Sequence, residues 1–597
     1  MRNRIEMHNF HIPVMGIGYT IDTPARVAHL GISSVISLVD DILMEKMREF
    51  HSMKLNLPFQ GITEKIEDFR AKRITLYLDL MDTMVQSRFK ELKEKLAEKS
   101  DELDAFIQML PTFSEVRHRF EEFIRNSPMK HEISEWIEKN LHPGSIDVNI
   151  MTKLDKDNYK GDEKLPVEYN DAHAALRGFA NSRLNSAIVL SAGMNPRLFG
   201  YFEKFDDFFP DSDGQLKKTI IVKVSDFRSA LIQGKMLAKR GLWVTEFRIE
   251  SGLNCGGHAF ATEGFLLGPV LEEFKTRREE LHRELERIYM EALRTSNRML
   301  PQTPYRIKIT AQGGVGTSSE HEFLLDYYKL DSVGWGTPFL LVPEVVNIDS
   351  ETLDEIAKAG EEDLYLSNIS PLGVPFNSLR NNSKDAEKQR WIVEGRPGSY
   401  CPKQYASLNT EFTDKPICTA SRQYQKRKIN ELAGQDLAPH EYSAAVEQIT
   451  DKSCICVGLG TSALLVNNLN TKVEGPGVSV CPGPNAAYFN RVSSLKEMIQ
   501  HIYGRQNLVN EQTRPHMFVK ELQLYVDYLR NQVQTSVKPI TDKQRKYFDS
   551  FRTNLMEGIS YYKKLFLDVF ETKRWSPQEV IPGLEKQREE LEKIKLL

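Results

Sequence analysis

Residues 309–344 constrain the fold of this chain more than any other segment, because apolar runs and glycine turns alternate along them. The run 307–310 has the character of a strand and stops at Gly313-Gly314. A helical stretch follows, and a second apolar run, 332–335, ends at Gly336-Thr337. Strand, turn, helix, strand and turn in this order are typical of parallel α/β proteins, in which a helix connects neighbouring strands.

The two glycine turns predict a phosphate-binding site. Gly313 and Gly314 carry no side chains, so backbone N–H groups approach an anion closely, and Gly336-Thr337 adds backbone donors and a hydroxyl. Ser319 is the expected N-cap of the intervening helix, with Glu322 at the capping-box spacing. Turns after the last two strands of a (β/α)8 barrel frequently hold a phosphate group. The alternative is two ordinary strand-to-helix turns without a ligand.

Six further strand-like runs precede this segment, which makes eight with the two already described. Their near-continuous apolar character is typical of parallel strands that are covered on both faces. Eight such units, separated by helices or loops, predict a closed (β/α)8 barrel (TIM barrel) with its active site at the C-terminal ends of the strands. The six runs are residues 12–17, 34–39, 146–151, 187–191, 219–224 and 244–249.

Helical regions flank the predicted barrel, which we assign to residues 1–40 and 142–381. Residues 41–141 are highly charged, with apolar side chains at three- and four-residue spacing. They predict a helical insertion after the second strand, placed to cover the barrel mouth. Residues 382–500 form a cysteine-containing extension, and residues 501–597 a helical C-terminal region. The apolar stripes of this last region are typical of core or dimer contacts, so a homo-oligomer is one expected outcome.

Composition predicts a soluble protein of the cytoplasm. The 79 Lys and Arg residues nearly balance the 83 Asp and Glu residues, which argues against nucleic acid or an anionic membrane as the main partner. The sequence shows neither an export signal nor the ~18 uninterrupted apolar residues of a membrane span. Six cysteines among 597 residues predict a reducing compartment rather than a disulfide scaffold.

A glycine-rich loop after the sixth strand carries a histidine. Gly256 and Gly257 let the backbone pass close to a ligand, and His258 follows them at the expected mouth of the barrel. Imidazole transfers protons near neutral pH, so His258 is a candidate catalytic residue. The alternative is a histidine that packs against the loop and hydrogen-bonds to its backbone.

Several short motifs occur along the chain in the order found in one family of flavoenzymes. They are PVMGIGYTIDTP near the first strand, Val148-Asn149 in the third, CGGHAF around His258, AQGGVG and GWGTPF at the glycine turns, and SPLGVPFNSLRN at residues 370–381. Through these motifs, residues 10–40 and 142–381 resemble the nitronate monooxygenase (2-nitropropane dioxygenase) family and its FMN-dependent enoyl-thioester reductase relatives. The order of the motifs along one barrel carries the resemblance, because each motif alone is short.

The resemblance implies a noncovalent FMN cofactor and a role for each matching residue. His258 would be the proton-transfer residue, which removes a proton from substrate in the monooxygenases and protonates substrate in the reductases. A cation close to the flavin stabilises its anionic reduced ring, and Lys223 is the residue expected there. Gly313, Gly314, Gly336 and Thr337 would hold the phosphate, and the isoalloxazine would lie against Met15, Gly16 and Gly18, with Asn149 close to the ring.

The chain departs from the family pattern beside the histidine loop. Asn254 and Cys255 replace the acidic and the small residue often found before GGH, and Gln312 stands where a small residue is usual. The thiol of Cys255 is either inert in packing or reactive. These departures concern the substrate more than the cofactor.

Five of the six cysteines fall between residues 401 and 481. Clustered cysteines in a reducing compartment indicate metal or redox chemistry. Thiolates bind iron–sulfur clusters and zinc, although the sequence contains no Cys-x2-Cys pair, and inert buried thiols are the alternative. An iron–sulfur cluster would give the flavin an electron-transfer partner. The candidate ligands are Cys401, Cys418, Cys454, Cys456 and Cys481.

Three functions agree with these features. The first, which we take as the principal expectation, is an FMN-dependent monooxygenase or oxidase of a small carbanion-forming substrate such as a nitronate. The second is an FMN-dependent reductase of an activated double bond that takes electrons from NAD(P)H or from an electron-transfer protein. The third is a non-catalytic flavin-binding or scaffold protein whose mouth is plugged by the insertion.

Overall fold

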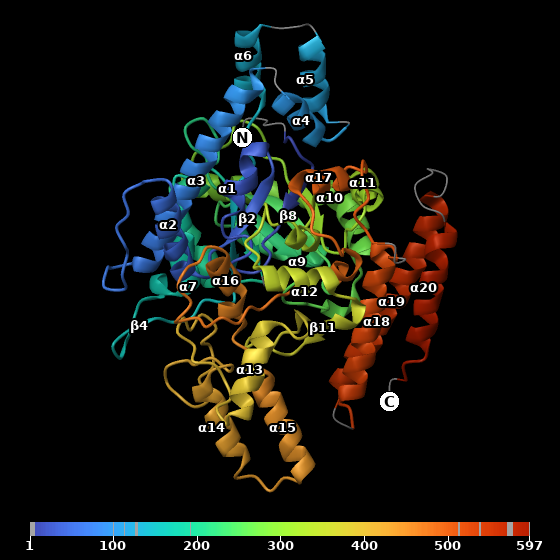
Figure 1. Ribbon diagram of the computed structural model, residues 1–597. Coiled ribbons are helices and arrows are strands. Elements are labelled where there is room, and N and C mark those ends of the chain that lie inside the picture. The colour runs from blue at the N-terminus through green and yellow to red at the C-terminus, as the bar shows by residue number, and fades with distance from the viewer. Residues whose placement is uncertain are drawn as a thin grey trace.

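Eight parallel strands close into a barrel at the centre of the molecule (Figure 1). The computed structural model describes residues 6–98, 101–112, 114–125, 129–191, 193–510, 514–536, 539–569 and 577–595. Around the barrel the strand order is β1, β10, β9, β8, β7, β6, β3 and β2, which confirms the predicted (β/α)8 fold. The barrel strands are β1 (Phe10–Ile12), β2 (Ser33–Ser37), β3 (Ile146–Met151), β6 (Ala187–Ser191), β7 (Thr219–Val224), β8 (Val244–Glu250), β9 (Lys308–Gln312) and β10 (Ser332–Gly334).

The first strand is earlier and shorter than the sequence predicts. β1 ends at Ile12, and residues 13–17, which we expected to be strand, form a loop at the mouth. Pro13 has no N–H group to donate to a neighbouring strand, which explains why the pairing stops there. The loop places Met15 and Gly16 beside the cavity described below.

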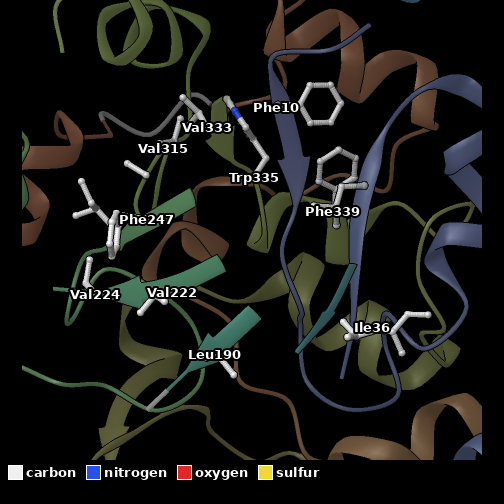
Figure 2. Close-up of a cluster of buried hydrophobic side chains, with 14 of the residues drawn as sticks. Phe10, Ile36, Leu190, Val222, Val224, Phe247, Val315, Val333, Trp335 and Phe339 are labelled. Atoms are coloured by element: carbon white, nitrogen blue, oxygen red, sulfur yellow. The ribbon is translucent and has the colours of Figure 1, made fainter. Parts of the chain in front are cut away.

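Alternate side chains of the barrel strands face two different surroundings. Leu190, Val222 and Phe247, on three neighbouring strands, belong to the large core shared with the surrounding helices (Figure 2). The interior of the barrel is partly polar, because Glu246 and Arg248 pair at 2.8 Å and are largely buried. A small separate apolar cluster fills the rest of the interior and contains Val35, Ala187, Val189 and Ile221, with Val14 packed against it.

Helices cover the outer face of the barrel. The start of α11 differs from the expectation, because Thr317 and not Ser319 is the N-cap and accepts a hydrogen bond from the N–H of Glu320. The Glu320 carboxylate accepts the N–H of Gly316 at 2.9 Å. The residues that cap this helix are therefore Thr317 and Glu320, each two positions before the expected Ser319 and Glu322. The helices are α1 (Thr23–Val27), α2 (Asp41–Lys54), α3 (Phe69–Leu96), α7 (Asp171–Ala180), α8 (Pro196–Tyr201), α9 (Phe227–Ala238), α10 (Leu267–Thr295), α11 (Ser318–Asp326) and α12 (Ser350–Lys358); a two-stranded ribbon, β4 (Tyr159–Lys160) and β5 (Glu163–Lys164), precedes α7.

The second half of the insertion forms a tip on the side opposite the mouth. We define the tip as α4 (Asp101–Met109), α5 (Glu115–Arg125) and α6 (Lys130–Asn140), which have a small core of their own. That core includes Met7 and Leu141, which precede β1 and β3, so the tip lies at the N-terminal ends of the strands. The expectation that the insertion covers the mouth is therefore wrong. α3 has 28 residues, about 42 Å at 1.5 Å per residue, and carries the chain past the barrel (Figure 1).

The segments after the barrel share its hydrophobic core. Buried residues of α16 (Ile455–Val466) and α18 (Met517–Thr535) belong to the same cluster as the barrel strands. Among the described helices, none alone is long and apolar enough to span a membrane, and only α15 with α16, bent by 45°, meets that test as a pair. The remaining elements are β11 (Leu364–Ser367), β12 (Phe376–Leu379), α13 (Ser383–Val393), α14 (Arg422–Leu432), α15 (Pro439–Asp451), α17 (Leu495–Ile502), α19 (Asp542–Val569) and α20 (Pro577–Glu592).

Candidate active site

A cavity of about 410 Å³ lies at the C-terminal ends of the barrel strands. Its volume falls in the range of about 300–1,000 Å³ that small-molecule and cofactor sites occupy. The barrel architecture predicts a site at this place. Polar side chains from the strand ends form the floor, and they are Ser37, Asn149, Ser191, Lys223, Glu250 and Gln312.

Glu250 organises the floor of the cavity. Its carboxylate pairs with the ammonium of Lys223 at 2.6 Å and accepts a hydrogen bond from Nε2 of Gln312 at 2.8 Å. We did not predict Glu250 as a site residue, although a carboxylate at the end of an apolar strand is a recognisable signal. The ion pair keeps the Lys223 charge at the cavity.

One buried acceptor atom on the floor, Oδ1 of Asn149, has no hydrogen-bond partner, and Asn149 lines the cavity. Oε1 of Gln312 lies beside the imidazole of His11, which offers it a partner inside the barrel. Buried polar atoms are nearly always hydrogen-bonded, so an unpaired acceptor facing a cavity indicates a bound donor. An N–H group on the edge of a planar ring would satisfy Asn149.

The two predicted glycine turns lie at one side of the cavity. Gly313 and Gly314 have φ angles of +109° and +86°, which favour glycine. A Cβ atom on Gly314 would lie 2.1 Å from Nδ2 of Asn254, so the turn also packs tightly against the histidine loop. Gly336 and Thr337 line the same side. The structure therefore brings together the four residues that we expected to hold a phosphate.

Segments distant in sequence complete this side of the cavity. The Thr337 hydroxyl oxygen accepts the N–H of Gly483 at 2.9 Å. Arg514 donates to the carbonyl oxygen of Gly314 at 2.5 Å and pairs with Glu320 at 2.7 Å. Gly483 and Arg514 were not predicted as site residues, because neither belongs to a strand-end motif of the barrel. Arg514 ties the turn to Glu320 on α11, whose carboxylate balances its charge.

His258 lines the cavity and is held by contacts on two sides. Its Nε2 lies 2.7 Å from Oγ of Ser370, and its ring meets that of Phe376 edge to face at 4.9 Å between centroids. Burial, together with the charge of Lys153, lowers the pKa of His258 to about 4. The imidazole is therefore uncharged at neutral pH and able to accept a proton.

The loop that carries His258 is fixed by the hairpin of β11 and β12. The N–H of Ala259 donates to the carbonyl oxygen of Pro375 at 2.8 Å. Asn377 donates its backbone N–H to the oxygen of Gly257 at 2.9 Å and its side-chain amide to the oxygen of Cys255 at 2.6 Å. The segment 370–381 thus positions the loop, and Ser370 within it contacts the histidine.

Gly18 is not a cavity residue, unlike Met15 and Gly16. Its N–H donates to the carbonyl oxygen of Leu459 at 2.8 Å. A Cβ atom on Gly18 would lie 2.9 Å from Cα of Gly460. Glycine at position 18 therefore allows close contact with α16, and its expected contact with a flavin ring is corrected accordingly.

The five cysteines that we predicted as metal ligands do not form one site. The carbonyl oxygen of Cys481 accepts the N–H of Gly257 at the cavity wall, and Cys418 belongs to a separate small apolar cluster. Within the described part of the chain, no three His, Cys, Asp or Glu side chains are arranged to hold a metal ion. The predicted iron–sulfur or zinc centre is therefore not found. Cys401, Cys454 and Cys456 do contact one another, with 3.9 Å between the first two sulfur atoms.

Comparison with known proteins finds similarity at the level of the fold. No family model and no curated protein sequence matches the chain. Solved structures similar to it include FabK from Thermotoga maritima, at 12% identity and a TM-score of 0.35 over 88% of this chain and 96% of that one. Another is the enoyl reductase domain of MlnA from the macrolactin biosynthesis cluster of Bacillus amyloliquefaciens, at 16% identity and a TM-score of 0.31 over 69% of this chain and 88% of that one. A third is nitroalkane oxidase from Streptomyces ansochromogenes, at 9% identity and a TM-score of 0.34 over 84% of this chain and 96% of that one.

Proposed function

We propose that this protein is an FMN-dependent oxidoreductase that oxidises a small carbanion-forming substrate, with His258 as the group that accepts the substrate proton. One observation carries the proposal. A single cavity at the barrel mouth combines glycine turns, an unpaired acceptor, a lysine and an uncharged imidazole.

The residues present fit FMN. The unpaired oxygen of Asn149 is suited to the N–H edge of an isoalloxazine ring, and Lys223 to its electron-rich side. Gly313, Gly314, Gly336 and Thr337 would hold the single phosphate group, and Arg514 fixes the first turn through the carbonyl oxygen of Gly314. FMN, when bound, supplies the two-electron chemistry of the reaction.

The residues of the chain supply proton transfer and charge stabilisation. The unprotonated imidazole of His258 accepts the proton that leaves the substrate carbon, and Ser370 keeps the ring oriented. The ammonium of Lys223 stabilises negative charge that develops at the cavity floor, and Glu250 holds that ammonium in place. Phe260, Leu340 and Leu459 line the cavity with apolar surface that limits access of water.

His258 is uncharged at neutral pH, which suits a residue that begins the reaction as a base. A double-bond reductase needs a residue that delivers a proton to substrate, and an imidazole with a pKa of about 4 carries no extra proton at neutral pH. Reduction of an activated double bond with NAD(P)H is therefore the second candidate and becomes an outcome of the experiment.

The visible spectrum of freshly purified protein tests the cofactor. We expect flavin absorption, and release of FMN when the protein is precipitated, because no covalent link is proposed. Anaerobic mixing with a neutral nitroalkane, which still carries the proton that His258 would remove, should then bleach the flavin, whereas NAD(P)H should not. A colourless protein that fails to take up added FMN would contradict the proposal. Bleaching by NAD(P)H alone would assign the protein to the reductases.

A further inference from the structure

Three cysteine thiols from two segments meet beside the cavity. Cys401 lies in the loop between α13 and α14, Cys454 is the N-cap residue of α16, and Cys456 lies in the first turn of that helix. The sulfur atoms of Cys401 and Cys454 are 3.9 Å apart, and Cys456 is within hydrogen-bonding reach of both. All six cysteines of the chain are free thiols. The proposed oxidation of substrate uses none of these three groups.

The three thiols form a path from the surface to the cavity. Cys401 is partly exposed, whereas Cys454 is 3% exposed and fully enclosed. Cys456 is buried in the protein but lines the cavity together with Leu459, one turn further along α16. A reagent in solution therefore reaches Cys401 first, and any change at Cys454 is felt by the cavity wall.

We propose that Cys401 and Cys454 form a reversible dithiol–disulfide couple that exchanges electrons with thiols and disulfides in solution. In the oxidising direction, the neighbouring Cys454 thiolate, whose pKa is lowered, takes the proton of Cys401, whose pKa is raised to about 12. The sulfur of Cys401 then attacks a disulfide RSSR to give a mixed disulfide, and the other half leaves as RSH with the proton from Cys454. The sulfur of Cys454 then attacks Cys401 and releases the second RSH. Two cysteine thiols and RSSR thus give one protein disulfide and two RSH, and two electrons pass to the reagent.

The geometry suits this exchange in both directions. A disulfide needs about 2.05 Å between sulfur atoms, so the pair at 3.9 Å must close by roughly 2 Å, which is within the reach of side-chain rotation in a loop. In the reducing direction, an external thiolate attacks the accessible sulfur of Cys401, and Cys454 is the leaving group. Cys454 lies at the N-terminus of a 12-residue helix and beside the thiol of Cys456, and both stabilise a departing thiolate.

Oxidation would also change the cavity. Formation of the disulfide removes the thiol protons of Cys401 and Cys454, so Cys456, which lines the cavity, loses both of its thiol hydrogen-bond donors. Disulfides of proteins in reducing compartments are usually transient and catalytic or redox-sensing. The couple is independent of the proposed flavin chemistry, because its chemistry needs only the two thiols and an external disulfide.

The experiment is a redox titration of the full-length protein. The protein is equilibrated with reduced and oxidised glutathione at a series of ratios, quenched with acid, alkylated and analysed by peptide mass spectrometry. We expect a linked pair of peptides containing Cys401 and Cys454, loss of two of the six free thiols, and full recovery in excess reduced glutathione. Cys401→Ser and Cys454→Ser should abolish the linkage. Cys418→Ser, a nearby thiol outside the trio, should leave it unchanged.

Several results would overturn the inference. They are six free thiols at every ratio, a glutathione adduct on Cys401 that never resolves, or a stoichiometric metal ion that protects the three thiols. Circular dichroism shows whether each serine variant is folded, and the wild-type linkage map does not depend on any variant. The titration is run with and without added FMN. A linkage in protein that binds no FMN would contradict the proposed function and leave the couple intact.

Discussion

At the scale of single residues, the environment of each group decides its chemistry. His258 resembles many packed histidines in its burial, but it lines a cavity and touches Ser370 rather than a backbone carbonyl. The ammonium of Lys223 lies 2.6 Å from the carboxylate of Glu250, and this ion pair keeps the lysine at the cavity floor instead of in solvent. Both assignments are open to direct mutation.

His258→Ala should retain FMN and lose roughly 10²–10⁴-fold in turnover, the range that a general base contributes. The flavin should stay because the phosphate turns belong to other segments of the chain. Flavin absorbance measures occupancy, and turnover is measured with a neutral nitroalkane, because its nitronate has already lost the proton that the base removes. His440→Ala, an exposed histidine on α15, is the control. Wild-type turnover in the His258 variant would mean that the residue only packs.

Gly336→Asp should abolish FMN binding, because it brings a carboxylate to the place proposed for the phosphate. Gly336 is a better test position than Gly314, where any Cβ meets Asn254 at 2.1 Å; the nearest atom to a Cβ on Gly336 is Cγ of Pro13 at 3.3 Å. Gly336→Asn, nearly identical in shape and uncharged, is the matched control and should bind FMN far more tightly. Equal affinities of the two variants, measured by flavin fluorescence titration, would remove the phosphate from this turn.

At the scale of elements, long helices and distant segments determine what surrounds the mouth. The helix α3 places the tip far from the mouth. Segments that follow the barrel in sequence, namely β11, β12 and the chain around Gly483, contact the loops that surround the cavity. Only the tip lies at the far end, because the first helix of the insertion, α2, packs against α16 through Leu43 and Met47. The extension, which we expected to be a separate part, supplies the cavity wall through α16.

Phe120→Ala should unfold the tip locally without affecting the cavity. Phe120 is fully buried and stacks on Trp136 with 4.6 Å between ring centroids, so truncation should cost about 3–5 kcal/mol. Hydrogen exchange followed by mass spectrometry should show faster exchange in α5 and α6 and unchanged exchange in the barrel strands. Flavin occupancy should equal that of the wild type. Its loss would mean that the tip and the mouth are coupled.

At the scale of the whole molecule, one large core unites the barrel with the C-terminal helices and encloses many ionisable groups. Glu521 on α18 accepts hydrogen bonds from Ser251 and from the N–H of Leu267, so it joins the helical region to the barrel. Burial raises the pKa of Glu521 to about 7. The pKa values of several buried histidines are lowered instead, and these histidines are more numerous than Glu521.

Stability should fall as the pH is lowered from about 6.5 towards 4. Burial lowers the folded-state pKa of five enclosed histidines to about 3 or 4, whereas in the unfolded chain they take up a proton near pH 6.5. Between these values only the unfolded chain binds the protons, so each histidine lowers the free energy of unfolding by about 1.4 kcal/mol per pH unit as the pH falls. Glu521 opposes this trend, because its folded pKa is raised, and Glu521→Gln should steepen the pH dependence. Urea midpoints between pH 7 and 4.5 measure the effect, and a constant midpoint would contradict it. The histidines are His8, His11, His258, His321 and His516.

The sequence by itself determined the features that are local in the chain. Apolar runs separated by helical stretches predicted the barrel, and the pairs Gly313-Gly314 and Gly336-Thr337 marked the turns, because backbone propensity and side-chain volume act over a few residues. His258 was recognisable for the same reason. Where local chemistry was misjudged, the error was small: β1 stops at the residue before Pro13, and the cap of α11 is two residues earlier than expected.

Only the tertiary structure decided which distant groups meet. Ser370 reaches His258 across 112 residues of sequence, Arg514 reaches Gly314 across 200, and Cys401 reaches Cys454 across 53. Such contacts depend on how whole helices pack, and no short pattern records the direction in which a helix such as α3 leaves the barrel. The sequence could therefore name the cysteines as a group, but packing selected three of them and excluded Cys481, whose backbone instead holds the histidine loop.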